Sequence, residues 1–216
     1  MKTLLLTGFE PFLEHPFNPA EYIVRQLNRK QIGSYQVAGK VLPVDYRRSA
    51  LELLDHYEAL QPDAVMMLGL AAGRNRITPE RIAININDGP NDISGAEMTD
   101  VPIAGDGPAA YISTLPVRKF VNLLNERGFP AELSNTAGAY LCNNVMYSML
   151  HHINKVKHSI PAGFIHVPPS NELAVNDRRL SGWPKENLQK GIEILIESLD
   201  QKIAGDERTW KSYTTD

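Results

Sequence analysis

Residues 3–27, TLLLTGFEPFLEHPFNPAEYIVRQL, contain the signals that decide the fold. The apolar run Thr3–Thr7 predicts a strand, which we expect Gly8 to end. A proline-rich loop follows, and Asn18 is a favourable N-cap with Pro19 at the first helical position. Apolar residues then recur at helical spacing, at Ala20, Ile23, Val24 and Leu27. The chain therefore begins with a strand, a loop and an amphipathic helix.

The remainder of the chain continues this alternation. We expect further strands at about 36–42, 64–69, 131–134 and 163–167. The helices between and after them show apolar faces at helical spacing: Ala50, Leu53, Leu54, Tyr57 and Leu60, then Val117, Phe120, Val121 and Leu124 before Gly128, and finally Leu188, Ile192, Leu195, Ile196 and Leu199. This order predicts an α/β sandwich with a largely parallel sheet. We expect a single domain over residues 1–202 and a polar tail over 203–216.

Composition argues against several classes of function. The chain has 216 residues, of which 43% are hydrophobic and 22% charged, as in an ordinary globular domain. A formal net charge of −3 argues against nucleic acid as a partner. The apolar runs are much shorter than the roughly 20 residues that span a bilayer, and the first is too short for a signal peptide. We therefore expect no membrane association. Because a lone cysteine cannot form an intramolecular disulfide, we also expect a cytoplasmic protein.

A parallel sheet also predicts where a ligand site lies. In open α/β sheets, ligands bind beyond the carboxyl ends of the strands, where loops lead into helices. This rule selects four segments of the chain, 8–18, 69–76, 134–142 and 166–172.

Cys142, in TAGAYLCNNVMY, is the only cysteine of the chain. It shares a helical face with Met146 and Met149, and free cysteine is commonly buried, so a core role is one interpretation. The other interpretation rests on position: Gly138 suits a tight turn, which places the thiol in the first turn of a helix. The helix dipole and the unpaired backbone N–H groups there favour a thiolate and can hold an oxyanion.

His166 is the candidate base for such a thiol. The stretch GFIHVPP places it near the end of a strand with apolar neighbours, which is typical of a central parallel strand. A satisfied core histidine is the competing interpretation. Among the other histidines, His15 in the first loop is the one rival with a route to the site.

Glu80, in ITPERIAININD, is the third candidate. If residues 80–87 form a strand, Glu80 shares an apolar face with Ile82, Ile84 and Ile86. A carboxylate on such a face is costly unless a cation or a hydrogen-bond donor meets it, and an imidazolium would do so. Alternatively the strand begins later, and Glu80 lies in a solvated turn.

Five segments in fixed order carry a resemblance to a known family: TGFEPF…NP at 7–19, LGLAAGR at 68–74, ERIAININD at 80–88, AGAYLCNN at 137–144 and GFIHVP at 163–168. Together they resemble pyroglutamyl peptidase I, also called pyrrolidone carboxyl peptidase, which is family C15 of the cysteine peptidases. The resemblance covers about residues 1–200. It implies a three-layer α/β/α sandwich with a twisted, mixed sheet of the phosphorylase/hydrolase-like kind. It also implies a catalytic triad, whose matching positions are Glu80, Cys142 and His166.

The activity implied by this resemblance is removal of an N-terminal pyroglutamyl residue from peptides through a thioacyl-enzyme. Cys142 would be the nucleophile, His166 would transfer its proton and Glu80 would orient the imidazole. The substrate-binding positions would be Phe9, Phe12, Asn18, Tyr140 and Leu141, although Asn18 is equally well explained as a plain N-cap. We expect no metal or organic cofactor, because the histidines show no ligand spacing with cysteine or carboxylates and the GLAAGR loop lacks the lysine and hydroxyl of a P-loop. The resemblance implies assembly into dimers or tetramers.

The chain departs from the family pattern at several positions. The family commonly has Gln where Leu70 stands and His where Asn144 stands. It has an arginine and an apolar wall in the stretch that here contains Pro90 and Asn91. An alternative hypothesis is therefore a divergent member of the fold that binds a small cyclic amide or nucleoside-like ligand without efficient hydrolysis. A structural or interaction protein without thiol-dependent activity is a third hypothesis.

Overall fold

A six-stranded mixed sheet forms the centre of the molecule. The computed structural model describes residues 1–12 and 16–200, so His15 and the predicted tail at 203–216 lie outside the described residues. The strand order is β2-β3-β1-β4-β10-β5. Strands β3, β1, β4 and β10 run parallel, whereas β2 and β5 pair antiparallel at the two edges. The strands are β1 Lys2–Phe9, β2 Gln31–Ile32, β3 Tyr35–Leu42, β4 Ala64–Leu70, β5 Thr78–Pro79 and β10 Ala162–Val167.

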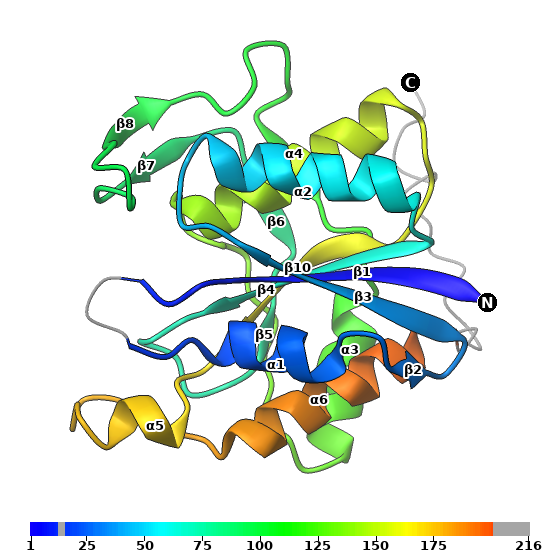
Figure 1. Ribbon diagram of the computed structural model, residues 1–216, viewed down its shortest axis with the longest axis vertical. Coiled ribbons are helices and arrows are strands. Elements are labelled where there is room, and N and C mark those ends of the chain that lie inside the picture. Colours follow the sequence, from blue (N-terminus) through cyan, green and yellow to red (C-terminus); the bar gives the residue numbers. More distant parts are fainter. Residues whose placement is uncertain (13–15, 201–216) are drawn as a thin grey trace.

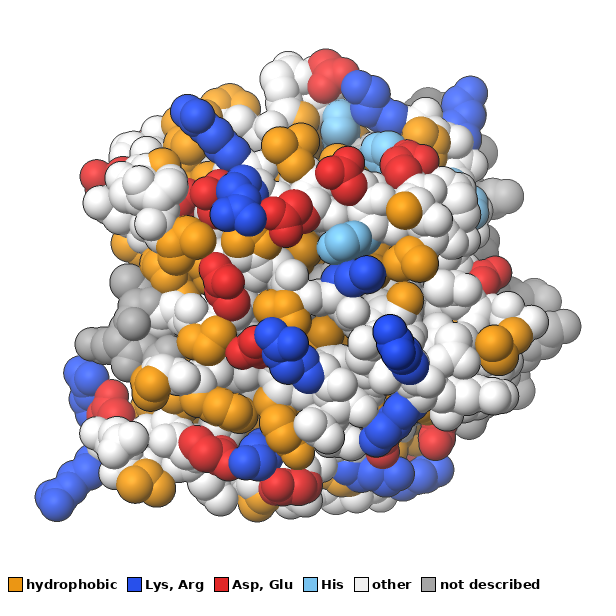
Figure 2. All heavy atoms as spheres, in the orientation of Figure 1, with side chains coloured by type: hydrophobic (Ala, Val, Ile, Leu, Met, Phe, Trp, Pro, Cys, Tyr) orange, Lys and Arg blue, Asp and Glu red, His pale blue; other side chains and the backbone are white. Residues whose placement is uncertain are grey.

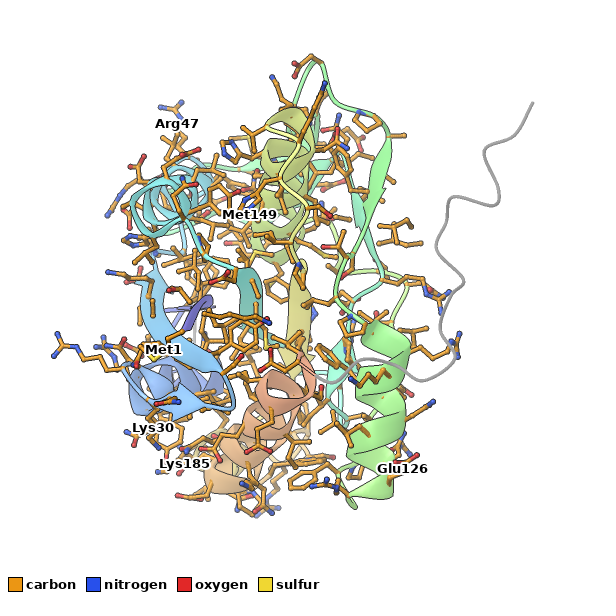
Figure 3. The ribbon with its side chains drawn as sticks, turned by 90° about the vertical axis from the view of Figure 1, so that its right-hand side faces the viewer. Met1, Lys30, Arg47, Glu126, Met149 and Lys185 are labelled. Atoms are coloured by element: carbon orange, nitrogen blue, oxygen red, sulfur yellow. The ribbon has the colours of Figure 1, made fainter. Side chains whose placement is uncertain are left out.

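Helices cover both faces of this sheet, which gives three layers (Figure 1). On one face lie α2 (Arg48–Leu60) and α4 (Leu141–Lys155); on the other lie α1 (Pro19–Leu27), α3 (Val117–Glu126) and α6 (Lys185–Ser198). Figure 3 views the molecule from the side on which Met1 lies, and shows Met149 of α4 and Lys185 of α6 on opposite sides of the sheet. A short helix, α5 (Asn171–Ala174), follows β10.

Each sheet face contributes alternate strand residues to its own apolar core, as the pleat requires. In β1, Leu4 and Leu6 pack with α1, α3 and α6, whereas Leu5 packs with α2 and α4. In β10, Ile165 belongs to the first of these cores and Phe164 to the second. His166, two residues after Phe164, therefore faces the layer that contains α4.

Two antiparallel sheets of two strands each lie outside the central sheet among the described residues. One pairs β6 (Ile82–Ile84) with β9 (Ala110–Ile112). The other pairs β7 (Asn87–Gly89) with β8 (Met98–Val101) and extends from the upper left of the molecule in Figure 1. These two small sheets were not predicted from the sequence.

The sequence predictions for the α/β fold and for the main helices are confirmed. The apolar face predicted for the first helix is buried throughout α1, and the Asn18 side chain caps that helix by accepting from the backbone N–H of Ala20 at 2.9 Å. Gly128, with φ of +80°, follows α3 as expected. The predicted strands at 36–42, 64–69 and 163–167 correspond to β3, β4 and β10.

The prediction that Gly8 ends the first strand is wrong. β1 continues through Gly8 to Phe9. A Cβ atom at Gly8 would lie 2.9 Å from the backbone oxygen of Ala20, so this glycine permits the close approach of α1 to the sheet. Glycine is therefore required at this position by helix–sheet packing, not by a turn.

Two other strand predictions are wrong. Residues 80–87 do not form one strand, because β6 and β7 are separate and Ile86 between them is exposed. Residues 131–134 form no strand but make isolated parallel bridges, Ala131 with Ile77 and Ser134 with Glu80. Short apolar stretches cannot distinguish one long strand from several short pairings, since the partner is decided by the tertiary fold.

Acidic and basic side chains are interspersed over the face shown in Figure 2. Among the helices of residues 1–12 and 16–200, none is both long and apolar enough to cross a membrane.

Candidate active site

A buried carboxylate–imidazole pair lies near the carboxyl end of β10. His166 Nδ1 donates to Glu80 Oε1 at 2.7 Å, and both side chains are buried, with Glu80 0% exposed. Glu80 directly follows β5, whose antiparallel pairing places Thr78 opposite His166. The interpretation of Glu80 as a residue of a solvated turn is therefore wrong. The imidazole that we expected to meet this carboxylate does so.

Arg74 is a second partner of the same carboxylate, and it was not among the site residues predicted from the sequence. Its Nη1 donates to Glu80 Oε1 at 2.5 Å and to Thr78 Oγ1 at 2.6 Å. Its Nη2 donates to the backbone oxygen of Thr136 at 3.0 Å. The buried charge of Glu80 is thus matched by a guanidinium as well as by the imidazole.

Cys142 lies in the first turn of α4, directly above β4. It is the second residue of the helix, and its side chain is partly exposed. Gly69 of β4 is the register partner of His166. A Cβ atom on Gly69 would lie 2.9 Å from Cys142 Sγ and 2.7 Å from Cζ of Phe164. The thiol therefore fills the space left by Gly69, at the strand position that pairs in register with His166.

The surroundings of the site favour a neutral thiol and a neutral imidazole. Burial, followed by the Glu80 carboxylate, raises the pKa of the Cys142 thiol to about 12, and Arg74 opposes this shift. Burial also lowers the pKa of His166, against the opposing effect of its hydrogen bond to Glu80. Desolvation therefore opposes the preference of the helix N-terminus for a thiolate.

An apolar pocket of about 220 Å³ opens beside the thiol. Its wall contains Cys142 and all five of the predicted substrate-binding residues, Phe9, Phe12, Asn18, Tyr140 and Leu141. The rings of Phe12 and Tyr140 stack with centroids 6.0 Å apart, and Tyr46 meets Tyr140 edge to face at 5.3 Å. A pocket smaller than the roughly 300–1,000 Å³ of sites for drug-sized ligands suits a single small residue.

Several residues of this wall were not predicted individually from the sequence, namely Glu10, Phe17, Val44 and Ala72. Three of them lie in the segments 8–18 and 69–76 that the strand-end rule selects, so this rule located them without naming them. Val44 follows β3 and could have been found by the same rule. Leu70, one of the departures from the family pattern, also lines the pocket.

Asn18 has two structural roles in this wall. Besides capping α1, its Nδ2 donates to the backbone oxygen of Glu10 at 3.2 Å. Asn18 therefore acts as the N-cap of α1 and also holds the preceding loop.

The two asparagines after Cys142 attach the start of α4 to β6, to β7 and to the residues between them. The Asn143 side chain accepts from the backbone N–H of Ile84 at 2.9 Å and donates to the backbone oxygens of Ile84 and Ile86. Asn144 Nδ2 donates to Asn87 Oδ1 at 2.9 Å. The substitution of the family's histidine by Asn144 therefore affects the support of this helix.

Among residues 1–12 and 16–200, no group of three or more His, Cys, Asp or Glu side chains is arranged to hold a metal ion. The chemistry that the site offers comes from the side chains themselves: a thiol, an adjacent imidazole and a carboxylate that orients this imidazole. These parts, at the carboxyl edge of a mostly parallel sheet, define the class of α/β cysteine hydrolases.

Comparison with known proteins identifies the family within this class. The family model described as pyroglutamyl peptidase matches residues 1–202. The chain therefore belongs to the pyroglutamyl peptidase family. The pyrrolidone-carboxylate peptidase of Halalkalibacterium halodurans is 52% identical over 197 residues, which cover 91% of this chain and 98% of that protein. The protein of the same name from Oceanobacillus iheyensis is 50% identical, with 93% of this chain and 100% of that protein covered.

Solved structures agree with this assignment. The pyrrolidone carboxyl peptidase from Thermococcus litoralis superimposes on this chain with a TM-score of 0.89 at 40% sequence identity. The superposition covers 94% of this chain and 99% of that chain. A mutant pyrrolidone carboxyl peptidase from Pyrococcus furiosus gives a TM-score of 0.88 at 39% identity, with 91% of this chain and 97% of that chain covered. The α/β architecture predicted for this chain is thus the architecture of these enzymes.

Proposed function

We propose that this protein is a cysteine exopeptidase that removes an N-terminal pyroglutamyl residue from peptides through a thioacyl-enzyme. The observation that carries this proposal is the apolar pocket that opens on Cys142, next to the buried His166–Glu80 pair. Membership of the pyroglutamyl peptidase family supports the same substrate class. In this proposal Cys142 is the nucleophile, His166 the general base and Glu80 the residue that orients it.

The acylation step begins from the neutral pair. Because Nδ1 of His166 donates to Glu80, its Nε2 is the nitrogen left to act as base. Nε2 takes the thiol proton while Sγ of Cys142 attacks the pyroglutamyl carbonyl. The buried Glu80 carboxylate stabilises the imidazolium that forms. This concerted transfer suits a thiol with a raised pKa, since no free thiolate has to exist beforehand.

The start of α4 supplies hydrogen-bond donors for the developing oxyanion. The backbone N–H of Asn144 donates to the oxygen of Tyr140 at 3.0 Å, so the N–H groups of residues 141–143 precede the helical hydrogen-bond ladder. We assign the backbone N–H of Cys142 as the principal donor. The tetrahedral intermediate then expels the peptide amine, which takes the proton from His166, and water later cleaves the thioester by the reverse roles.

The pocket wall explains a preference for pyroglutamate. A pyroglutamyl N-terminus presents a flat lactam without an ammonium group, and the aromatic walls of Phe9, Phe12 and Phe17 suit its faces. Asn18 and Glu10 are the side chains of this wall that can pair with the lactam amide. With Leu70 at the position of the family's glutamine, the recognition of that amide depends more strongly on these two residues.

The stretch that lacks the family's arginine contributes to the wall in another way. Asn91 accepts a hydrogen bond from the Tyr140 hydroxyl at its backbone oxygen, at 3.4 Å. Asp92 Oδ2 accepts from the backbone N–H of Tyr46 at 2.8 Å. This stretch therefore positions the aromatic pair Tyr46 and Tyr140, and we propose that the backbone of α4 provides the oxyanion contacts.

We further propose that the protein acts on peptides in the cytoplasm as a homodimer or homotetramer. The lone Cys142, which cannot form an intramolecular disulfide, supports a reducing compartment. Size-exclusion chromatography with light scattering would measure the oligomeric state, and a monomer at micromolar concentration would contradict this part of the proposal.

The direct test is release of a fluorophore from a pyroglutamyl amide under reducing conditions. We expect wild type to cleave this amide, to leave prolyl and glutaminyl amides intact and to lose activity on Cys142→Ser substitution. After an acid quench, mass spectrometry should find the pyroglutamyl group on Cys142. Equal rates for wild type and Cys142→Ser would reject the proposal.

A further inference from the structure

One guanidinium group contacts three parts of the site. Arg74 reaches the Glu80 carboxylate and the Thr78 hydroxyl through Nη1, at 2.5 and 2.6 Å. Through Nη2 it reaches the backbone oxygen of Thr136 at 3.0 Å. Thr136 belongs to the segment that leads into α4 and so to Cys142. Arg74 thus joins the strand edge that holds the carboxylate to the segment that carries the thiol.

Oxygen Oε1 of Glu80 receives both of the contacts that hold this carboxylate. His166 Nδ1 and Arg74 Nη1 donate to Oε1, whereas Oε2 is buried and has no hydrogen-bond partner among the described residues. A buried carboxylate with one satisfied oxygen needs a strong partner to stay in place. The neutral imidazole is a weaker partner than a guanidinium, so Arg74 contributes more than His166 to holding Glu80, while the hydrogen bond from His166 keeps the carboxylate beside the ring.

We propose that Arg74 is a positioning residue for the reaction, which holds Glu80 against His166 and ties this pair to the segment before Cys142. This inference rests on the proposed function. Arg74 is not among the described residues that line the pocket, and it acts through Glu80. For this positioning, the planar geometry of the guanidinium matters as much as its charge, because its two terminal nitrogen atoms donate to three acceptors.

The charge of Arg74 also adjusts the proton equilibrium of the site. The titratable and charged groups that surround the His166 ring are Glu80 after β5, Arg74 in the preceding loop and Cys142 on α4. Arg74 lowers the pKa of both His166 and Cys142, opposite to the effect of Glu80. Loss of Arg74 would therefore leave a buried negative charge that raises both pKa values. More of the imidazole would then be protonated at neutral pH and unable to act as base.

Arg76 provides a matched control two residues further along the same loop. Its Nε lies 3.9 Å from an oxygen of Glu132, and both side chains are well exposed. An exposed pair at this separation contributes little. Substitution of Arg76 therefore removes one arginine from this loop without changing the buried site.

The test compares Arg74→Gln, Arg74→Lys and Arg76→Gln with wild type by two measurements. The first is NMR titration of the His166 ring, assigned with His166→Gln, which does not depend on activity. The second is the pH profile of kcat and KM for a pyroglutamyl amide. For Arg74→Gln we expect the His166 pKa to rise, the acid limb of kcat/KM to move to higher pH, and kcat to fall about a hundredfold with little change in KM.

Arg74→Lys keeps the positive charge but replaces the two-nitrogen guanidinium group with a single ammonium group. It should leave the His166 pKa near the wild-type value and lower kcat by less than Arg74→Gln, whereas Arg76→Gln should match wild type in both measurements. If Arg74→Gln does not fold, a wild-type kcat in Arg74→Lys overturns the proposal.

An unchanged His166 titration in folded Arg74→Gln also overturns the proposal, even if wild type is an active peptidase. A shifted titration together with an inactive wild type would instead reject the proposed function and leave the positioning of His166 supported.

Discussion

The molecule contains two His–Glu pairs with the same separation and very different surroundings. His166 Nδ1 and His152 Nε2 each lie 2.7 Å from a glutamate oxygen, of Glu80 and Glu58 respectively. The side chains of the first pair are 6% and 0% exposed, and those of the second are 22% and 54% exposed. His152 also packs edge to face on Tyr57, with ring centroids 5.2 Å apart. Distance alone therefore does not distinguish the buried pair from the surface pair.

Three features separate the two pairs. Glu80 is buried, it has a cationic partner in Arg74, and its histidine pairs in register with Gly69, over which the Cys142 thiol lies at the wall of a pocket. The Glu58 pair lies where α2 and α4 meet solvent and has no thiol beside it. Solvent screens such an exposed pair, so it contributes less than about 1 kcal/mol to stability. Each feature can be removed separately, and the exposed pair serves as the control.

Replacement of the two histidines should show the largest difference. We expect His166→Ala to lower kcat/KM for a pyroglutamyl amide by about 10³–10⁴-fold, because the thiol loses its general base. His152→Ala should stay within about twofold of wild type, since an exposed pair does not reach the pocket. Steady-state kinetics on both variants, with circular dichroism to confirm folding, would measure this. Equal losses in the two variants would show that the comparison is wrong.

Replacement of the two glutamates should give a smaller but still clear difference. Glu80→Gln keeps the shape but cannot stabilise an imidazolium, so we expect a loss of roughly 10²–10³-fold, less than for the nucleophile. Because the hydrogen bond that His166 donates to Glu80 raises the pKa of His166, its weakening should move the acid limb of kcat/KM to lower pH. Glu58→Gln should change neither. A shift of the acid limb to higher pH would contradict the assignment of His166 as the base.

The sequence was sufficient to predict the main strands of the sheet, its helices and three residues that the structure brings into one region, for identifiable reasons. Apolar spacing marks helices such as α1, and continuous apolar runs mark buried parallel strands such as β4. Glu80 and His166 were found because each is a polar residue in an apolar stretch. Cys142 was found because it follows a loop at the strand-end edge and begins a helix. The family resemblance then connected them.

Other parts were beyond reach of the sequence because tertiary contacts decide them. Arg74 reaches Glu80 only when the loop after β4 folds back over β5, and no spacing rule encodes that path. Gly8 was misinterpreted because a glycine that admits a helix has the same sequence signal as a glycine that ends a strand. The raised pKa of Cys142 depends on burial, which its position at a helix start does not reveal.

Gly69→Ala should displace the Cys142 thiol from its position over β4 and leave both His–Glu pairs in place. A methyl group there would lie 2.9 Å from Cys142 Sγ and 2.7 Å from the Phe164 ring, so the thiol must shift. We expect kcat to fall by about tenfold to a hundredfold, because small displacements of reacting atoms are costly. The NMR titration of His166 should change little. A wild-type kcat in this variant would show that the thiol does not need its observed position.

The last prediction concerns the protonation state of the Cys142 thiol in the absence of substrate. The exposed His152–Glu58 pair should not influence it. With the pKa of Cys142 raised to about 12 by burial and by Glu80, the thiolate fraction should grow about tenfold per pH unit across the neutral range. The rate of alkylation of Cys142 by iodoacetamide should therefore rise steadily from pH 6 to pH 9, and at pH 7 it should be lower than that of free cysteine. His152→Ala should give the same profile. A thiolate–imidazolium pair would instead give a rate that is constant between two pKa values, so a plateau in this range would show that the buried pair is ionised before substrate binds.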